Sequence, residues 1–321
     1  MGEMKGVISV HMRKKKWSRP ELAACAYYVQ EPEEKKGSWA DLFPKRQPLH
    51  LELGCGKGVS TAKMAHDNLD VNYIAIDINA DVMGCTRRNV EKAYGQDPVE
   101  NILLTNCHIE YIHTMLDERD PIERIYINFC NPWSSRPKHH KRRLTHPRQL
   151  IQYRRFLKEG GEIWFKTDDK LLFNDSLVYF DACGFERVYV TDDLHSSGFT
   201  PNYVSEHEQK YTAQGMKIHF GIFRRLPGDL ELDAVTWRLW DGLMEEDEDV
   251  REGFIVKRIV EDDFGCEGLP EGEELQVTIL LIDDEGQLRR VRMADSLAYA
   301  RGIQEGCRVT LAADGTLELT K

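Results

Sequence analysis

Leu51-Glu52-Leu53-Gly54-Cys55-Gly56-Lys57-Gly58 is the stretch of sequence that decides the fold. An apolar run beginning at Leu49 leads into it, and a helical pattern beginning at Val59 follows it, so the three glycines fall in a strand-to-helix turn. Glycine allows left-handed backbone, and the N–H groups at a helix N-terminus can approach a ligand closely. The stretch therefore predicts a ligand-binding turn.

The surrounding pattern predicts an α/β domain. From Leu49 to about Phe223, short apolar runs alternate with helical stretches, which is typical of a Rossmann-like, mostly parallel sheet covered by helices on both faces. Seven strands are expected, at residues 49–53, 72–78, 101–105, 124–129, 161–166, 186–190 and 217–224. Helices are expected at residues 59–66, 80–94, 147–158 and 171–183, with Gly160, Gly161 and Gly184 as stops.

A second, smaller unit is expected after Arg225, where Leu226-Pro227-Gly228 forms a natural linker. Short strands separated by turn signals are expected at residues 254–260, 275–282, 288–293, 308–312 and 317–320, which indicates a small barrel or sheet. The predicted organisation is a basic N-terminal arm and cap over 1–48, the α/β domain over 49–225, and an acidic β-rich accessory domain over 226–321.

The charge of the chain is unevenly distributed. The whole chain carries a net charge of −11, but residues 226–321 carry −14 and residues 1–225 carry +3. The acidity therefore does not exclude a nucleic-acid partner for the α/β domain. The acidic domain should repel a phosphate backbone, so we expect it to contribute a fold, an interface or a brake and not to grip RNA.

Composition also sets the expected compartment. No run approaches the ~20 apolar residues of a membrane span, and the N-terminus lacks the apolar stretch of a signal peptide, so a cytoplasmic protein is expected. The eight cysteines are scattered, without C-x-x-C or zinc spacing, which predicts reduced thiols and no metal site. The oligomeric state stays open between monomer and homodimer.

Two acidic residues indicate what the glycine turn binds. Glu52 precedes the first glycine by two positions, and Asp77 ends the next expected strand. A dinucleotide turn prefers G-x-G-x-x-G and receives a pyrophosphate, for which Glu52 is a poor neighbour. A carboxylate suits the cationic end of S-adenosylmethionine, and Asp77 can accept hydrogen bonds from ribose hydroxyls. The alternative is that both acids are ordinary charged residues at strand ends.

The segment Asn128-Phe129-Cys130-Asn131-Pro132-Trp133 follows the fourth expected strand, and six Lys and Arg with no acid occupy residues 136–148. Since the carboxyl ends of strands face the ligand crevice in an open α/β sheet, Asn131 should lie beside the cofactor's methyl group. The basic stretch beyond it suits phosphates. Its alternative reading is a solvated charge cluster.

These motifs resemble the bacterial tRNA (guanine-N7)-methyltransferases, whose pattern includes N-F-x-D-P-W followed by H-x-K-R-R-L. The resemblance covers roughly residues 12–225. Further matches in order are Met12–Trp17, Gly37-Ser38-Trp39, Lys166–Asp169, Asp193-Leu194-His195 and Ser205–Glu208. It implies a class I enzyme that transfers the methyl group of S-adenosylmethionine to N7 of a guanosine in the variable loop of tRNA.

The resemblance also implies site residues. The cofactor would contact Glu52, Gly54, Gly56, Gly58, Asp77, Cys107, His108 and the catalytic position Asn131. The tRNA would contact Ser135, Arg136, Lys138, His140, Lys141, Arg142, Arg143, Asp168, Ser205, Glu206, His207 and Glu208. Asp168 follows the fifth expected strand, where a carboxylate can accept from guanine N1–H and the exocyclic amine; its alternative role is a helix cap.

The sequence departs from the family pattern at several positions. Asn131 replaces an aspartate, Cys107 and His108 stand near a missing adenine-side aspartate, Ser205 replaces a threonine, and the spacing after Trp133 is one residue longer. Guanine N7 has a free lone pair, so no general base is required, and positioning with electrostatics suffices. We expect an active enzyme in which Asn131 slows turnover. The alternatives are a catalytically weakened tRNA-binding protein and, less favoured, a dehydrogenase.

Overall fold

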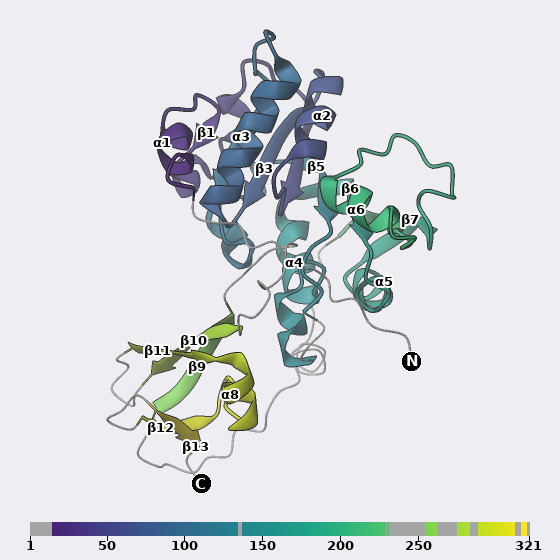
Figure 1. Ribbon diagram of the computed structural model, residues 1–321. Coiled ribbons are helices and arrows are strands. Elements are labelled where there is room, and N and C mark those ends of the chain that lie inside the picture. Colours follow the sequence, from purple (N-terminus) through teal and green to yellow (C-terminus); the bar gives the residue numbers. More distant parts are fainter. Residues whose placement is uncertain are drawn as a thin grey trace. The chain divides into compact units, whose positions relative to one another are not determined.

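The computed structural model describes residues 15–133, 137–228, 230, 254–261, 275–282, 288–311 and 316–319. The chain divides into two compact units, with the division near residue 241. The first is an α/β unit and the second is rich in β-strands (Figure 1).

The α/β unit is built on one large sheet in the order β1-β4-β3-β2-β5-β6-β8-β7. All pairings are parallel except those of β8 with β6 and β7. The strands are β1 Tyr28–Val29, β2 Leu49–Leu53, β3 Asn72–Asp77, β4 Ile102–Asn106, β5 Ile122–Asn128, β6 Leu157–Thr167, β7 Phe185–Thr191 and β8 His219–Arg225. The seven predicted strands are confirmed, and the two-residue β1 adds an eighth at the edge.

Six α-helices belong to the described part of this unit: α1 Ser18–Ala23, α2 Val59–Asp67, α3 Ala80–Tyr94, α4 Pro147–Phe156, α5 Lys170–Ala182 and α6 Glu206–Thr212. Short 3-10 helices are Pro32–Lys35, Trp39–Leu42, Ile109–Thr114 and Pro137–Arg142. The helices contribute to two different apolar cores. One core includes side chains of α4 and α5, and the other includes side chains of α2 and α3. Helices therefore cover both faces of the sheet, as predicted (Figure 1).

One helix boundary was predicted wrongly. The helix expected over 147–158 ends at Phe156, and β6 begins at Leu157. Gly160, with φ of 74°, therefore lies in the irregular start of a strand, where the β5–β6 register shifts, and does not stop a helix. Gly184 does follow α5, with φ of 71°. The apolar pattern of the sequence could not locate this boundary, because Leu157 would be buried both as the end of the helix and as the start of the strand.

The sheet order places a ligand crevice at β2. Successive strands run from β2 to β3 and β4 on one side, whereas β5 pairs with the other side of β2. The connections leaving the carboxyl ends of β2 and β5 therefore diverge, and ligands bind at such a switch point. The glycine turn follows β2, and the Asn131 segment follows β5.

The second unit contains a five-stranded antiparallel sheet in the order β11-β10-β9-β12-β13. Its elements are β9 Phe254–Glu261, β10 Gln276–Ile282, β11 Leu288–Ala294, α8 Asp295–Ala300, β12 Arg308–Leu311 and β13 Leu317–Leu319. Its own apolar core includes Val256, Ile259, Val277 and Val309. All five predicted strands are confirmed, and α8 is an addition. Across the described residues of both units, the helices are too short or too polar to cross a bilayer.

Candidate functional site

The glycine turn after β2 is held against β3. The N–H groups of Gly54 and Cys55 donate to the Ile76 carbonyl, at 2.9 and 3.0 Å. Gly54, Gly56 and Gly58 have φ of 75°, 55° and 67°, which is a left-handed backbone conformation that residues other than glycine rarely adopt. The turn therefore needs its three glycines for backbone reasons.

The glycines differ in what they face. A Cβ built on Gly56 would have no described atom within 4 Å, so its backbone borders open space. A Cβ on Gly58 would lie 2.3 Å from Thr86 Cγ2, so this glycine allows α2 to approach α3. Gly56 thus offers room for a ligand at the start of α2, whereas Gly58 is required for packing.

Glu52 lies buried beneath the turn, with 3% of its surface exposed. Its Oε2 accepts from Thr61 Oγ1 at 2.5 Å, and its Oε1 accepts from Asn128 Nδ2 at 3.0 Å. Burial raises the pKa of this carboxyl, and the two hydrogen bonds offset that effect in part. Glu52 therefore joins β2, α2 and β5 through a buried carboxylate that would gain from a cationic neighbour.

Asp77 closes β3 at the same edge. Its Oδ2 accepts from Gly56 N–H at 3.0 Å, and its Oδ1 accepts from Asn79 N–H at 2.9 Å. Because Asp77 and Asn106 are register partners of β3 and β4, Cys107 and His108 leave the sheet beside it. Burial raises the pKa of the Cys107 thiol to about 11, which keeps it protonated near neutral pH.

The Asn131 segment has a constrained backbone. Phe129 and Trp133, on either side of Asn131, have φ of 53° and 48°, which is uncommon for residues other than glycine. Asn131 is exposed, and its Oδ1 accepts from Trp133 N–H at 3.0 Å. Such conformations cluster at ligand sites because the surrounding structure must hold them. Here the Phe129 N–H donates to the Lys166 carbonyl at 2.8 Å.

The prediction that Arg143 contacts tRNA needs correction. Its side chain is 1% exposed, and it donates to the Pro132 carbonyl at 2.7 Å and to Asp175 Oδ2 at 2.6 Å. It supports the Asn131 segment from behind and is not available to phosphates. Of the other basic-stretch residues, His140, Lys141 and Arg142 are half-buried, whereas Ser135, Arg136 and the Lys138 side chain lie outside the described residues.

Arg143→Ala is expected to lower the free energy of unfolding by about 2–4 kcal/mol, because it leaves the Pro132 carbonyl and Asp175 without their buried partner. Urea unfolding followed by circular dichroism measures this. Arg155→Ala, on the exposed side of α4, is the matched control and should cost less than about 0.5 kcal/mol. Equal effects of the two substitutions would contradict the supporting role.

Asp168 and His207 meet across two elements. His207 Nε2 lies 3.3 Å from Asp168 Oδ1, and the His207 and Phe129 rings lie 4.7 Å apart between centroids. Burial alone would raise the pKa of Asp168, but the hydrogen bond and charge of His207 lower it below the ordinary value. The cap of α5 is Asp169, which accepts from Leu172 N–H at 2.7 Å, so the alternative role for Asp168 is excluded.

The segment 205–208 divides into exposed and buried positions. Ser205 caps α6, accepting from Glu208 N–H at 3.1 Å. Glu208 is fully buried and accepts from Lys166 Nζ at 2.9 Å and from Asn202 Nδ2 at 2.8 Å. The prediction that Glu208 contacts tRNA therefore needs correction, because its carboxylate is enclosed by protein partners.

Glu206 is exposed, and its Oε2 lies 3.2 Å from Lys57 Nζ in the glycine turn. This ion pair joins α6 to the turn, so the predicted cofactor and substrate segments lie side by side.

The sequence analysis assigned no role to Asn128 or Lys166. In the structure Asn128 donates a hydrogen bond to Glu52, and Lys166 donates one to Glu208. The sequence signal that could have identified them is that each is a polar residue at or next to the end of a buried strand, Asn128 in β5 and Lys166 in β6. Among the described residues, no group of His, Cys, Asp and Glu is arranged to hold a metal ion.

Known proteins similar to this chain were found by family model, by sequence and by structure. A family model described as a putative methyltransferase matches residues 46–220. A tRNA (guanine-N(7)-)-methyltransferase of Clostridium botulinum (strain Eklund 17B / Type B) is 55% identical over 215 residues, which are 66% of this chain and 98% of the relative. One of Clostridium perfringens (strain SM101 / Type A) is 52% identical over 220 residues, 68% of this chain and 100% of the relative. The solved structure of the 16S rRNA methyltransferase KamB matches at 12% identity with a TM-score of 0.42, covering 70% of this chain and 100% of that chain.

Proposed function

The chain belongs to the tRNA (guanine-N7)-methyltransferase family, and we propose that its α/β unit binds S-adenosylmethionine at the glycine turn and the target guanosine beside Asp168. It is an S-adenosylmethionine-dependent enzyme that methylates N7 of a guanine in tRNA. That this guanosine lies in the variable loop, and that the enzyme works in the cytoplasm with its tRNA substrate, are parts of the proposal. The observation that carries the proposal is the contact of Phe129 with His207, which joins the Asn131 segment to the Asp168 carboxylate.

The turn residues fit the cofactor. Gly56 borders open space, and Asp77 lies at the adjacent strand end. Glu52 is a buried carboxylate whose hydrogen-bond donors, Thr61 and Asn128, are neutral; the charge of Lys166 acts on it, but Lys166 is hydrogen-bonded to Glu208. S-adenosylmethionine supplies a methyl group activated by a sulfonium charge. In our proposal Asp77 accepts from the ribose hydroxyls, and the charge of Glu52 favours the cofactor's cationic amino-acid end.

The guanine is held by hydrogen bonds and needs no base. Asp168 accepts from guanine N1–H and the exocyclic amine, and His207 fixes its carboxylate from the side. Because N7 carries a lone pair and no proton, methyl transfer requires alignment and charge stabilisation and leaves no proton to be removed. Asn131 lies at the loop between cofactor and guanine, where its amide can position but adds no negative charge.

Asn131→Asp is expected to raise kcat by up to about tenfold, because a carboxylate favours the positive charge on the sulfonium and on the methylated ring, and each tenfold corresponds to about 1.4 kcal/mol. The aspartate can still accept from Trp133 N–H, so the loop should be retained. Single-turnover methylation of unmodified tRNA measures the effect, with Asn131→Ala as the control that loses both hydrogen bond and charge. An unchanged or lower rate in the Asp variant would contradict this role.

Removing the acidic β-rich unit is expected to leave tRNA affinity unchanged or tighter at the same salt concentration, because the residues removed, 231–321, carry a net charge of −13. The truncation belongs after Leu230, since the buried Arg154 donates to the carbonyls of Leu226 and Gly228, at 3.2 and 2.6 Å. Filter binding of tRNA at two salt concentrations measures the effect. A severalfold loss of affinity would instead assign RNA contacts to this unit, where Arg289, Arg290 and Arg292 lie on β11.

A further inference from the structure

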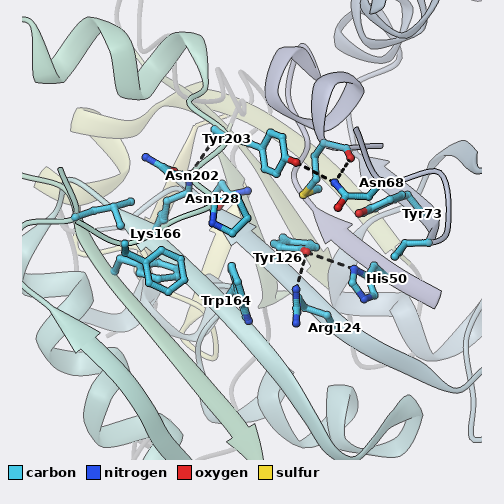
Figure 2. Close-up of a pocket in the computed structure, with 16 residues that line it drawn as sticks. His50, Asn68, Tyr73, Arg124, Tyr126, Asn128, Trp164, Lys166, Asn202 and Tyr203 are labelled. Carbon is cyan, nitrogen blue, oxygen red and sulfur yellow. Dashed lines mark hydrogen bonds between the residues drawn. The ribbon is translucent and has the colours of Figure 1, made fainter. Parts of the chain in front are cut away.

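A pocket lies against the sheet face formed by β2, β3, β5, β6 and β8 (Figure 2). Its cavity volume is about 130 Å³, and the segment 199–203 borders it opposite the sheet. None of its lining residues belongs to the proposed cofactor or guanosine contacts. His50 and Tyr126 precede Glu52 and Asn128 by two positions on their strands, so the pocket extends from the carboxyl edge back along the sheet.

The walls of the pocket are aromatic. The Trp164 ring lies 5.9 Å from that of Tyr126 and 5.5 Å from that of Phe199, both in edge-to-face arrangements. Tyr73 and Tyr203 lie on the α2 side, where Asn68 Nδ2 donates to the Tyr203 hydroxyl at 2.9 Å. Aromatic rings with a few polar groups between them suit a planar ligand that has hydrogen-bonding edges.

Arg124 presents donors into this space (Figure 2). Its guanidinium lies 4.2 Å from the centre of the Trp164 ring, and its side chain is 31% exposed. Within the described residues it makes one hydrogen bond, a long one of 3.4 Å to the Tyr126 hydroxyl. A guanidinium has five N–H donors in a fixed fork, so several remain for a ligand with two adjacent acceptors.

Glu162 does not satisfy this guanidinium. Its Oε2 lies 3.6 Å from Arg124 Nη2, beyond hydrogen-bond distance, while it accepts from Trp164 Nε1 at 2.9 Å and from Arg224 Nη2 at 3.1 Å. Its charge still offsets that of Arg124. His50 adds no charge, because burial and the neighbouring Arg124 lower its pKa to about 3. Lys166 also lines the pocket, but its ammonium is paired with the buried Glu208 at 2.9 Å. The pocket therefore offers hydrogen-bond donors with little net positive charge, which favours a neutral heterocycle over a phosphate.

We infer that this pocket binds a nucleobase, packed against the aromatic side chains of Tyr126, Trp164 and Phe199 and held at an acceptor edge by the Arg124 fork. Guanine, through O6 and N7, and cytosine, through O2 and N3, offer two adjacent acceptors of this kind. The base comes either from a free nucleoside or from an unpaired position of the tRNA. The second source rests on the proposed function, and it would couple the pocket to catalysis, because the segment 199–203 continues into Ser205 and α6.

Calorimetric titration of the full chain with guanosine, cytidine and uridine tests the inference. Arg124→Lys is the diagnostic variant, because it keeps the charge beside Glu162 but loses the planar fork. It is expected to weaken guanosine or cytidine binding about tenfold to hundredfold. Asp168→Asn is the matched control, since it alters the proposed guanosine contact of the catalytic site and should leave binding in the pocket unchanged. Circular dichroism melting checks that each variant is folded, and Tyr203→Phe, which leaves Arg124 intact, should leave guanosine affinity within about threefold.

A second arm identifies the source of the base. If it belongs to tRNA, Arg124→Lys raises KM for tRNA at least tenfold with kcat unchanged; if free nucleosides bind and this KM is unchanged, the free nucleoside is the ligand. The inference is overturned if Arg124→Lys alters neither nucleoside affinity nor KM, or if Asp168→Asn alone abolishes nucleoside binding. The titration does not depend on methylation, so a chain that fails to methylate tRNA would contradict the proposed function without deciding this one.

Discussion

Asp168→Asn is expected to lower kcat/KM for tRNA methylation by about 10²–10⁴-fold. The carboxylate is proposed to accept two hydrogen bonds from guanine, and a hydrogen bond to a charged group contributes about 1.5–3 kcal/mol. An asparagine amide keeps one acceptor and turns a donor toward the guanine amine, so one contact is kept without its charge and the other becomes repulsive. His207, 3.3 Å away, would also lose its charged partner.

The matched control for this prediction is Asp181→Asn on the exposed end of α5, which loses only its ion pair with Arg187. It should change kcat/KM less than twofold, since surface ion pairs contribute about 0–1 kcal/mol and this one lies outside the site. Affinity for S-adenosylmethionine should be unchanged in Asp168→Asn, which separates a guanine contact from a general loss of structure. A kcat/KM within about threefold of the unmodified enzyme would exclude the proposed role of Asp168.

Glu52→Gln is expected to weaken S-adenosylmethionine binding by about 10²-fold or more, yet to leave the cofactor-free protein as stable or more stable near pH 8. A buried carboxylate that favours a cationic ligand is also one that burial penalises. The glutamine amide can replace both present contacts, accepting from Asn128 and donating to the Thr61 hydroxyl. The substitution therefore removes the charge with little change in packing.

The effect of Glu52→Gln on stability should depend on pH. Burial raises the folded-state pKa of Glu52 above its ordinary value of 4.5, so the folded chain holds the proton more tightly than the unfolded chain. The resulting destabilisation is absent below the ordinary value and is complete above the raised one. The stability difference between Glu52→Gln and the parent should therefore grow as pH rises above about 4.5. Urea unfolding without cofactor measures it. A Gln variant that binds the cofactor normally would refute the role of Glu52.

The sheet was predictable because its buried strands have strong local signals. Apolar runs bounded by turn residues identified β2 to β8 and β9 to β13, and the three glycines placed the ligand turn. The exceptions are short or ambiguous. β1 has two residues, α1 and α8 have six each, and α4 passes directly into a buried strand at Leu157. Such elements depend on tertiary contacts more than on periodicity.

The site was only partly predictable, because burial of a charge depends on partners remote in sequence. Arg143 and Glu208 have the residue types of phosphate and base contacts, but Asp175 and Lys166 fold against them and enclose them. Asp168 and Asp169 could not be distinguished as ligand and helix cap until the start of α5 was known. Conversely, the role of Asn128 follows only from the pairing of β2 with β5, which brings its amide to Glu52.

This chain transfers methyl groups to guanine N7 with Asn131 in place of the family's aspartate. The most direct test incubates the full chain with unmodified tRNA and S-adenosylmethionine labelled in its methyl group, then digests the tRNA and separates the nucleosides. We expect label in 7-methylguanosine, and much less of it with Asp168→Asn. Absence of label in 7-methylguanosine, with tRNA and cofactor binding intact, would contradict it.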